Sequence, residues 1–335
     1  MLTRDSQLFT AFPHSRGFSL VELMVALVIT LILLAGVAQI FLSSKKSYAI
    51  QNTLGRQQET GRYAFDVLAT DLRRAGFWGS SLAISSGSVV PAHTDCLSGD
   101  SEWGRVTDLP IYGLNSTEDI ISDYLCIPDP GSTNGYFGQG DVLVVRYADP
   151  EIIGGTDNTA FVATRFYLRS NPLDAYDGLI DTGNNLGTPS VNAPASELHA
   201  YAYYIGDSGQ QCNGANVPSL FRVGLSNTGT PTEIEEVAYG VDQLQVQYGL
   251  DTLDPSTDPP DNSVAAYRNA GHGDLNESAE WDQVIAARFW LLTRAECPET
   301  GYTNTNTYNI GDLAYTPGDA YRRQLYQTTV SLRNR

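Results

Sequence analysis

The stretch that decides the fold is GFSLVELMVALVITLILLAGVAQIFLSSKK, residues 17–46. Between Glu22 and Lys45 it contains 22 consecutive residues without a charge. As an α-helix rising about 1.5 Å per residue, this run spans roughly 33 Å, enough to cross the hydrocarbon core of a bilayer. It is longer than the apolar core of an ordinary signal peptide, and no small-residue cleavage site follows it. We therefore expect the segment to stay on the protein as an anchor.

Glu22 lies at the edge of this apolar run. A carboxylate inside a membrane is costly and usually has a partner or a function. The alternative is that Glu22 reaches the membrane interface from a favourable position near the start of a helix. Its position fits both interpretations.

The net charge changes sign along the chain. Residues 1–80 carry a net +3, whereas residues 81–335 contain 12 Arg, no Lys and 33 acidic residues, a net −21. Such a body argues against a nucleic-acid binder, which needs clustered positive charge. The pattern is typical of a membrane-anchored protein that is exposed outside the cytoplasm.

The residue pattern predicts one long helix followed by a β-rich body. No proline occurs between residues 13 and 91, apolar residues recur at helical spacing over 61–72, and Gly76 is a natural stop. We therefore expect a helix over about 19–75. Strand-like runs follow at 142–145, 161–168, 200–205, 219–225, 244–248, 284–292 and 326–332. The predicted fold class is α+β, with the helix packed on a mostly antiparallel β-sheet.

Two of these runs carry specific expectations. Residues 244–248 alternate between apolar and polar, which predicts a strand with one face in water. Residues 284–292 are apolar on both alternating faces apart from Arg288, which predicts a central strand or a buried helical segment.

The four cysteines, Cys96, Cys126, Cys212 and Cys297, form an even set in the acidic body. Two disulfides are the leading interpretation, and four cysteines allow three pairings. Proximity in the sequence favours Cys96–Cys126 with Cys212–Cys297. Free buried thiols would suit a cytosolic domain instead. No Cys-x-x-Cys spacing occurs, so a zinc or redox motif has little support.

Two other motifs contain candidate catalytic or metal-binding residues, and no cofactor is expected from either. The tetrapeptide GDSG at residues 206–209 matches a serine-protease nucleophile loop, but no histidine stands in a recognisable catalytic context, and we expect an ordinary turn. Four aspartates could surround Ca²⁺ in one loop, although their spacing does not match an EF-hand. They are Asp251, Asp254, Asp258 and Asp261.

Residues 16–22, RGFSLVE, resemble the class III leader of type IV pilins and pseudopilins. The resemblance implies cleavage after Gly17 by the prepilin peptidase and N-methylation of the new terminus, Phe18. It also implies that Glu22 pairs with the terminal amine of a neighbouring subunit. Two charges that are each costly in lipid become tolerable together, and the pair would fix the axial register of packed helices.

Segments of the body resemble PilW-type minor pilins. They are GRYAF at 61–65, DLRRAG at 71–76, GDVLVVRYA at 140–148, GVDQLQVQYG at 240–249, WDQVIAARFWLLTR at 281–294 and VSLRNR at 330–335. The resemblance implies a pilin-like fold and a low-abundance pilin that helps to initiate type IV pilus assembly and lies at or near the tip. Implied partners are other minor pilins, the major pilin and a tip adhesin; nucleic acid is not among them.

The resemblance also implies domain boundaries and a cellular location. It implies a cleaved leader at 1–17, a membrane-spanning and filament-packing half-helix at 18–44, an amphipathic second half at 45–76, and an extracytoplasmic β-rich domain at 77–335. The protein would cross the inner membrane once, with a periplasmic domain, and later join a cell-surface pilus that serves twitching motility and adhesion.

Two alternatives remain open. A large pseudopilin of a type II secretion system shares the leader and the overall build. A membrane-tethered extracellular enzyme or binding module would also explain the acidic body. Against the enzyme stands the lack of a paired catalytic motif in the sequence, and a mere anchor has no need of Gly17-Phe18 or Glu22.

Replacement of Gly17 by Ala or a larger residue is expected to block leader removal, because the peptidase would cleave directly after this position. Mass spectrometry of the membrane-bound protein should then find the full leader on the variant and a Phe18 terminus on the wild type. An unchanged mature mass in the variant would contradict the assigned cleavage site.

Overall fold

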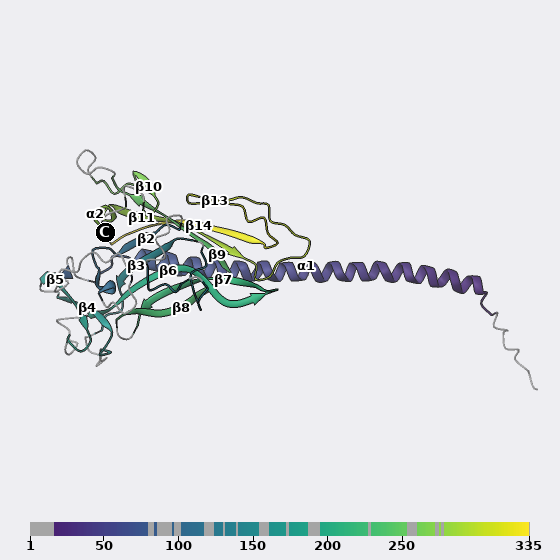
Figure 1. Ribbon diagram of the computed structural model, residues 1–335, viewed down its shortest axis with the longest axis horizontal. Coiled ribbons are helices and arrows are strands. Elements are labelled where there is room, and N and C mark those ends of the chain that lie inside the picture. The colour runs from purple at the N-terminus through teal and green to yellow at the C-terminus, as the bar shows by residue number, and fades with distance from the viewer. Residues whose placement is uncertain are drawn as a thin grey trace, which may run out of the picture. The chain divides into compact units, whose positions relative to one another are not determined.

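The computed structural model describes residues 17–79, 84–85, 96, 102–116, 124–129, 131–138, 140–153, 161–171, 174–186, 195–226, 229–252, 260–271, 275 and 278–334. The chain divides into two units, Met1–Thr53 and Leu54–Arg335. Helix α1, Leu20–Arg74, supplies residues to both units, and every strand belongs to the second (Figure 1).

Helix α1 begins and ends within one residue of the expected bounds, 19 and 75. Its C-terminal stop is Gly76, whose φ of +73° lies in the left-handed region that glycine adopts without strain. The Gly76 N–H donates to the carbonyl of Arg146 at 3.0 Å, and the Phe77 N–H donates to the carbonyl of Arg74 at 2.8 Å. These bonds turn the chain away from the helix axis.

The larger sheet has eight strands in the order β1-β5-β4-β6-β3-β2, with β7 and β8 continuing from β6. Strand β1 pairs with β5 in parallel, and the other pairs described in this sheet are antiparallel. The strands are β1 (Ile84–Ser85), β2 (Ile111–Leu114), β3 (Val142–Ala148), β4 (Phe166–Asn171), β5 (Asp174–Thr182), β6 (Ala195–Cys212), β7 (Ala215–Leu225) and β8 (Pro231–Tyr239).

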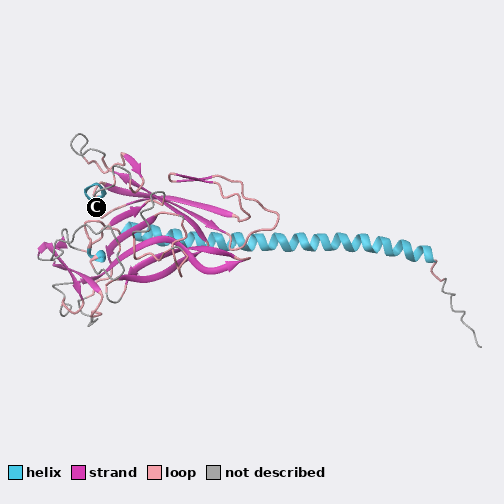
Figure 2. Ribbon diagram, viewed as in Figure 1, coloured by secondary structure: helices cyan, strands magenta, loops and turns pink. Residues whose placement is uncertain are grey.

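The second sheet has the order β10-β9-β11-β14, and a separate pair joins β12 to β13. Figure 2 shows these strands in magenta. Their bounds are β9 (Val241–Leu250), β10 (Ala266–Arg268), β11 (Val284–Arg294), β12 (Tyr308–Ile310), β13 (Leu313–Tyr315) and β14 (Arg323–Ser331). Two short helices complete the described elements, η1 (Trp103–Arg105) and α2 (Ser278–Trp281).

The strand expectations are confirmed with two differences. Residues 284–292 lie in the central strand β11, but residues 161–165 precede β4 rather than belonging to it. The expectation that residues 244–248 have one face in water is wrong at Gln245, which is 1% exposed, whereas Gln247 is partly exposed. The Gln245 amide donates to Ser116 Oγ at 3.2 Å, so a distant segment replaces the water on this face.

The main core is shared by both sheets and by the second-unit part of α1. Its members include Ala64, Leu68 and Leu72 from the helix, Leu143 and Val145 from β3, Val246 from β9, and Phe289 and Leu291 from β11. A second core covers the opposite face of the larger sheet and includes Val142 and Val144. Strand β3 is therefore buried on both faces, which explains its continuous apolar run.

Asp141, directly before β3, links the two sheets. Its side chain is buried and accepts the backbone N–H groups of Ser116 at 3.0 Å and of Val246 in β9 at 2.8 Å. Burial raises the pKa of Asp141 to about 7, although the two hydrogen bonds act in the opposite direction. Near neutral pH the linkage between the sheets therefore includes a titrating group.

The folded-state pKa of Asp141 lies above the unfolded value of about 3.9, so its contribution to stability is full below about pH 4 and is lost as the pH rises through 7. Asp141→Asn removes this titration. The wild type should lose stability relative to the variant as the pH rises. The difference between their free energies of unfolding should therefore change by on the order of 1–4 kcal/mol between pH 4.5 and pH 8, in favour of the variant. Denaturant unfolding of both full-length proteins in detergent measures the shift. A difference that stays constant with pH would contradict it.

Candidate functional site

The start of α1 is stabilised by a capping box. Ser19 precedes the first helical residue, and its Oγ accepts the backbone N–H of Val21 at 3.3 Å. Glu22 Oε2 accepts the backbone N–H of Ser19, also at 3.3 Å. The S-x-x-E spacing lets both side chains satisfy backbone donors that a helix start leaves open. Within one chain, Glu22 therefore has a local role at the helix N-terminus.

Gly17 and Phe18 lie ahead of the helix, and both are exposed. The Phe18 side chain is 87% exposed, and the position of a Cβ at Gly17 has no neighbouring atom within 4 Å. The rest of the expected leader, residues 1–16, lies outside the described residues. The bond expected to be cleaved is thus in non-helical, accessible backbone.

The first-unit part of α1 is an apolar surface. In the described chain, α1 is the one helix long and apolar enough to cross a membrane. Large apolar side chains from Leu20 to Leu42 are more than half exposed in the single chain. A helix that is apolar all round is suited to lipid or to packing against other apolar helices.

The second-unit part of α1 packs closely against β14. Gly61 is buried, and a Cβ at this position would lie 2.3 Å from Cε2 of Tyr326. One turn earlier, Gln57 Nε2 donates to the carbonyl of Arg322 at 2.8 Å, and the Tyr326 hydroxyl donates to the carbonyl of Gln57 at 3.4 Å. Glycine at 61 is therefore explained by close packing.

Asp71 is a buried carboxylate on the same helix. It accepts the hydroxyls of Tyr147 in β3, at 2.9 Å, and of Tyr203 in β6. Its Oδ2 also lies 3.7 Å from Nη1 of Arg222 in β7. Burial, with Asp71 adding to it, raises the pKa of both tyrosines, so they remain neutral donors. One side chain of α1 thereby contacts three strands of the larger sheet.

Sequence reasoning did not single out Asp71. The available signal was its position three residues after Leu68, on the apolar face of the helical stretch over residues 61–72, which also contains Asp66. A charge in that setting needs partners when it is buried. The tyrosines that supply them lie 76 and 132 residues away in the sequence.

Both disulfides have the pairing that sequence proximity favours. Cys96–Cys126 and Cys212–Cys297 have Cα–Cα distances of 5.2 and 5.3 Å. Cys212 ends β6 at the tip of the β6–β7 hairpin, where Asn213 and Gly214 both have positive φ. Because Cys297 follows β11, the second bond joins the larger sheet to the smaller one.

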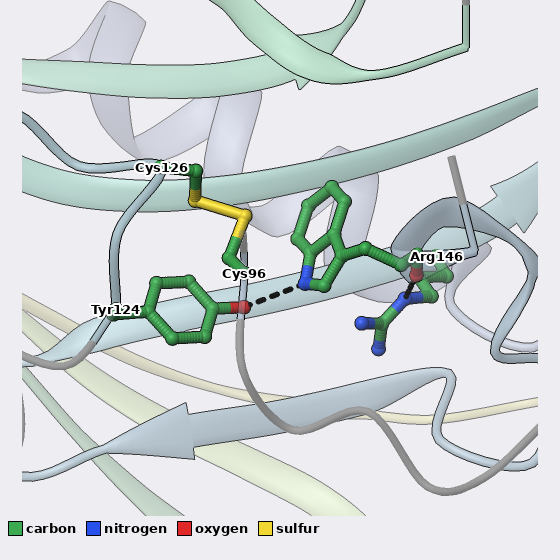
Figure 3. The surroundings of a disulfide bond; sticks show 5 residues. Cys96, Tyr124, Cys126 and Arg146 are labelled. Atoms are coloured by element: carbon green, nitrogen blue, oxygen red, sulfur yellow. Dashed lines mark hydrogen bonds between the residues drawn. A yellow bond between two sulfur atoms is a disulfide. The ribbon is translucent and has the colours of Figure 1, made fainter. Parts of the chain in front are cut away.

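Figure 3 shows the first disulfide beside a buried arginine. Trp103 Nε1 donates to the Tyr124 hydroxyl at 2.8 Å, and Arg146 Nε donates to the carbonyl of Trp103 at 3.0 Å. The guanidinium carbon of Arg146 lies 4.9 Å from the Trp103 ring centroid. Burial lowers the pKa of Arg146 to about 10, which leaves it charged at neutral pH. Carbonyls and an aromatic face stabilise this charge within the second core.

The GDSG tetrapeptide is not a turn, contrary to expectation. It lies in β6, where the pairing with β7 shifts register between residues 207 and 211 and Gly209 has a φ of +71°. A bulge takes the extra residues without ending the strand. Ser208 Oγ donates to the carbonyl of Val217 at 2.7 Å. The serine therefore supports the hairpin backbone.

The candidate calcium loop, for which the spacing of the aspartates gives only weak support, is described in part. Asp254 and Asp258 lie outside the described residues. Asp251 Oδ1 accepts the backbone N–H groups of Asp261 at 3.0 Å and Asn262 at 2.9 Å, so it stabilises the loop backbone. Within the described ranges, no group of three or more His, Cys, Asp or Glu residues is placed to hold a metal ion.

Comparisons with known proteins give matches to the N-terminal segment and to the C-terminal part of the body. Residues 202–334 match the family model described as Type IV Pilus-assembly protein W, and residues 13–38 match the prokaryotic N-terminal methylation motif. The comparison with curated proteins gives no match. Among solved structures, a type IV-like pilin from Thermus thermophilus matches at 14% identity and a TM-score of 0.27, covering 58% of this chain and 79% of that one.

The chain therefore carries a PilW-family domain together with the N-terminal methylation motif of a class III prepilin leader. The two matches support a type IV pilin-like minor pilin. One long apolar helix followed by antiparallel sheets agrees with this class, which points to a structural rather than an enzymatic protein.

Gly61→Ala is expected to lower the free energy of unfolding by about 1–3 kcal/mol, because the new methyl group overpacks against Tyr326. Gly55→Ala is the matched control, since a Cβ there has no neighbouring atom within 4 Å and alanine should stabilise the helix by about 0.5–1 kcal/mol. Thermal unfolding of the two full-length variants measures both effects. Equal shifts would show that Gly61 is not a packing position.

Proposed function

We propose that this protein is a minor pilin that helps to initiate type IV pilus assembly and lies at or near the pilus tip. The observation that carries the proposal is the presence of an N-terminal methylation motif and a PilW-family domain in one chain. Before assembly, α1 would anchor the protein in the inner membrane with the body in the periplasm. Two disulfides and a strongly acidic, lysine-free body suit that oxidising compartment.

Maturation would begin at the Gly17–Phe18 bond. Its exposure ahead of the helix would give a peptidase access to non-helical backbone without unfolding α1. Cleavage there by the prepilin peptidase would leave Phe18 as the terminal residue, ready for N-methylation. The capping box would survive, because the Ser19 N–H remains an amide after cleavage.

Assembly would then give Glu22 a second partner. In the single chain its carboxylate accepts one hydrogen bond from Ser19. In an apolar helical bundle, we expect the carboxylate to pair with the terminal amine of a neighbouring subunit, since an unpaired charge in lipid is costly. This pair would set the axial register between subunits. The apolar surface of residues 20–42 would supply the packing.

The body would supply the specificity of the subunit. Its partners would be other minor pilins and the major pilin, with a tip adhesin as a further one. No cofactor or catalytic step enters the proposal. Ser208, in the protease-like tetrapeptide, already donates to a backbone carbonyl.

Glu22→Ala should leave leader cleavage intact but reduce surface filaments several-fold. Two further variants separate the roles of this side chain. Glu22→Gln keeps an oxygen that can accept the capping bond but removes the charge, whereas Ser19→Ala removes one cap and keeps the charge. Filament counts by electron microscopy and the mature mass are the readouts. Normal assembly by Glu22→Gln would exclude the ion pair.

The direct test is mass spectrometry of sheared surface filaments beside washed membranes. An N-methylated Phe18 peptide in the filament fraction supports processing and incorporation. An intact Met1 leader confined to membranes would overturn the proposal. Deletion of the gene then separates the two filament systems, because the proposal expects loss of pili with secretion of type II substrates unchanged.

A further inference from the structure

A groove crosses the second unit beside the C-terminal part of α1. One hollow of about 410 Å³ lies between the helix and the larger sheet, with Tyr63 and Thr70 on its helix side. A second, more enclosed hollow of about 200 Å³ extends toward Ser226 at the end of β7. Both hollows are lined by His199, Tyr201 and Arg222, so they adjoin at these three side chains and together form the groove.

The groove is lined by a row of aromatic rings. Tyr147 in β3 is paired with His199 in β6, and Tyr201 follows two residues later on the same face. The ring centroids of Tyr147 and His199 are 5.3 Å apart, and those of His199 and Tyr201 are 5.7 Å apart with planes inclined by 17°. The three rings form a partly apolar platform in which His199 and Tyr201 are near-parallel and Tyr147 is inclined by 45° to His199.

The orientation of His199 is fixed by its neighbours. Its Nε2 lies 3.1 Å from Asp149 Oδ2, and its Nδ1 lies 3.2 Å from the Tyr201 hydroxyl. Both ring nitrogens therefore have partners in the ring plane. The imidazole can therefore contact a ligand through its ring face rather than through a ring nitrogen.

Planar charged groups border the platform in pairs. Arg165 Nη1 lies 2.8 Å from Glu197, and Arg222 Nη2 lies 2.7 Å from Glu235. The Arg222 guanidinium also lies 4.2 Å from the Tyr201 ring centroid. Each pair offers N–H donors and carboxylate acceptors side by side, and pairing holds them in place before a ligand arrives.

These pairs select against an ionic ligand. An anion would have to displace Glu197 or Glu235 from its arginine, at the cost of a strong hydrogen bond. For a metal cation, the described residues offer no cluster of three or more ligands. A hydroxyl group both donates and accepts, so a neutral polyol can bind both members of each pair without separating them.

We infer that this groove binds a neutral oligosaccharide, whose apolar ring faces lie against His199, next to the Arg222-covered Tyr201, and whose hydroxyls bond to the Arg222–Glu235 and Arg165–Glu197 pairs. An elongated groove of this size suits several linked sugar units rather than one small molecule. The inference concerns the isolated body and does not depend on filament assembly.

The test is calorimetric titration of the full-length protein in lipid nanodiscs, which avoid sugar-headed detergents. The probes are cellohexaose, chitohexaose, mannohexaose and isomaltohexaose. We expect saturable binding of at least one probe with a Kd below about 1 mM. The affinity should change little between low and high salt, because the ligand is uncharged. His199→Ala and Glu235→Ala should each weaken binding at least about fivefold.

The chain offers a matched control away from the groove. Arg322 pairs with Glu299 at 2.5 Å and lies 4.3 Å from the Tyr302 ring centroid, which repeats the arginine–glutamate–tyrosine arrangement. Glu299→Ala should bind like the wild type. Glu235 is 57% exposed, so its variant should fold, and circular dichroism checks each protein.

Three results would overturn the inference. The first is no saturable binding of any probe up to about 10 mM. The second is undiminished binding in both groove variants. The third is salt-sensitive binding of decalysine without binding of any oligosaccharide, which would assign the groove to a cationic peptide.

Discussion

The structure depends on one helix that must meet two different environments. Over residues 20–42 its apolar side chains are exposed in the single chain, as a segment bound for lipid or for other helices requires. From Gly61 to Leu72 the apolar residues lie on one face, which is buried in the main core. The main core contains side chains from the helix and from both sheets, so residues 54–74 of α1 are a structural part of the body.

Polar groups inside the body specify how that core is assembled. Asp71 on the helix, Asp141 before β3 and Arg146 within β3 are all buried, and each has hydrogen-bond partners from other elements. A buried polar group without a hydrogen-bond partner would destabilise the fold by more free energy than one apolar contact contributes. They therefore restrict the ways in which the apolar surfaces can meet. These hydrogen bonds fix the position of the helix against β3 and of β3 against β9.

Local signals made much of the fold predictable. Helical spacing and Gly76 gave the helix bounds within a residue, apolar runs located β3 and β11, and alternation located β9 and β14. The features that were missed depend on distant partners. Gln245 is buried because Ser116 lies against it, and the GDSG tetrapeptide stays in a strand because β7 pairs with it. The groove combines residues from α1, β3, β6 and β7, which no local pattern reveals.

The two disulfides differ in when they can form. Cys96 and Cys126 are 30 residues apart, so both members of this pair are present early in chain synthesis. Cys297 follows Cys212 by 85 residues, and between them lie β7 to β11. The second bond can therefore form only after the strands from β7 to β11 have been synthesised. The second bond therefore closes only over a body in which the β6–β7 hairpin already lies against the end of β11, and it then covalently fixes that arrangement of the two sheets.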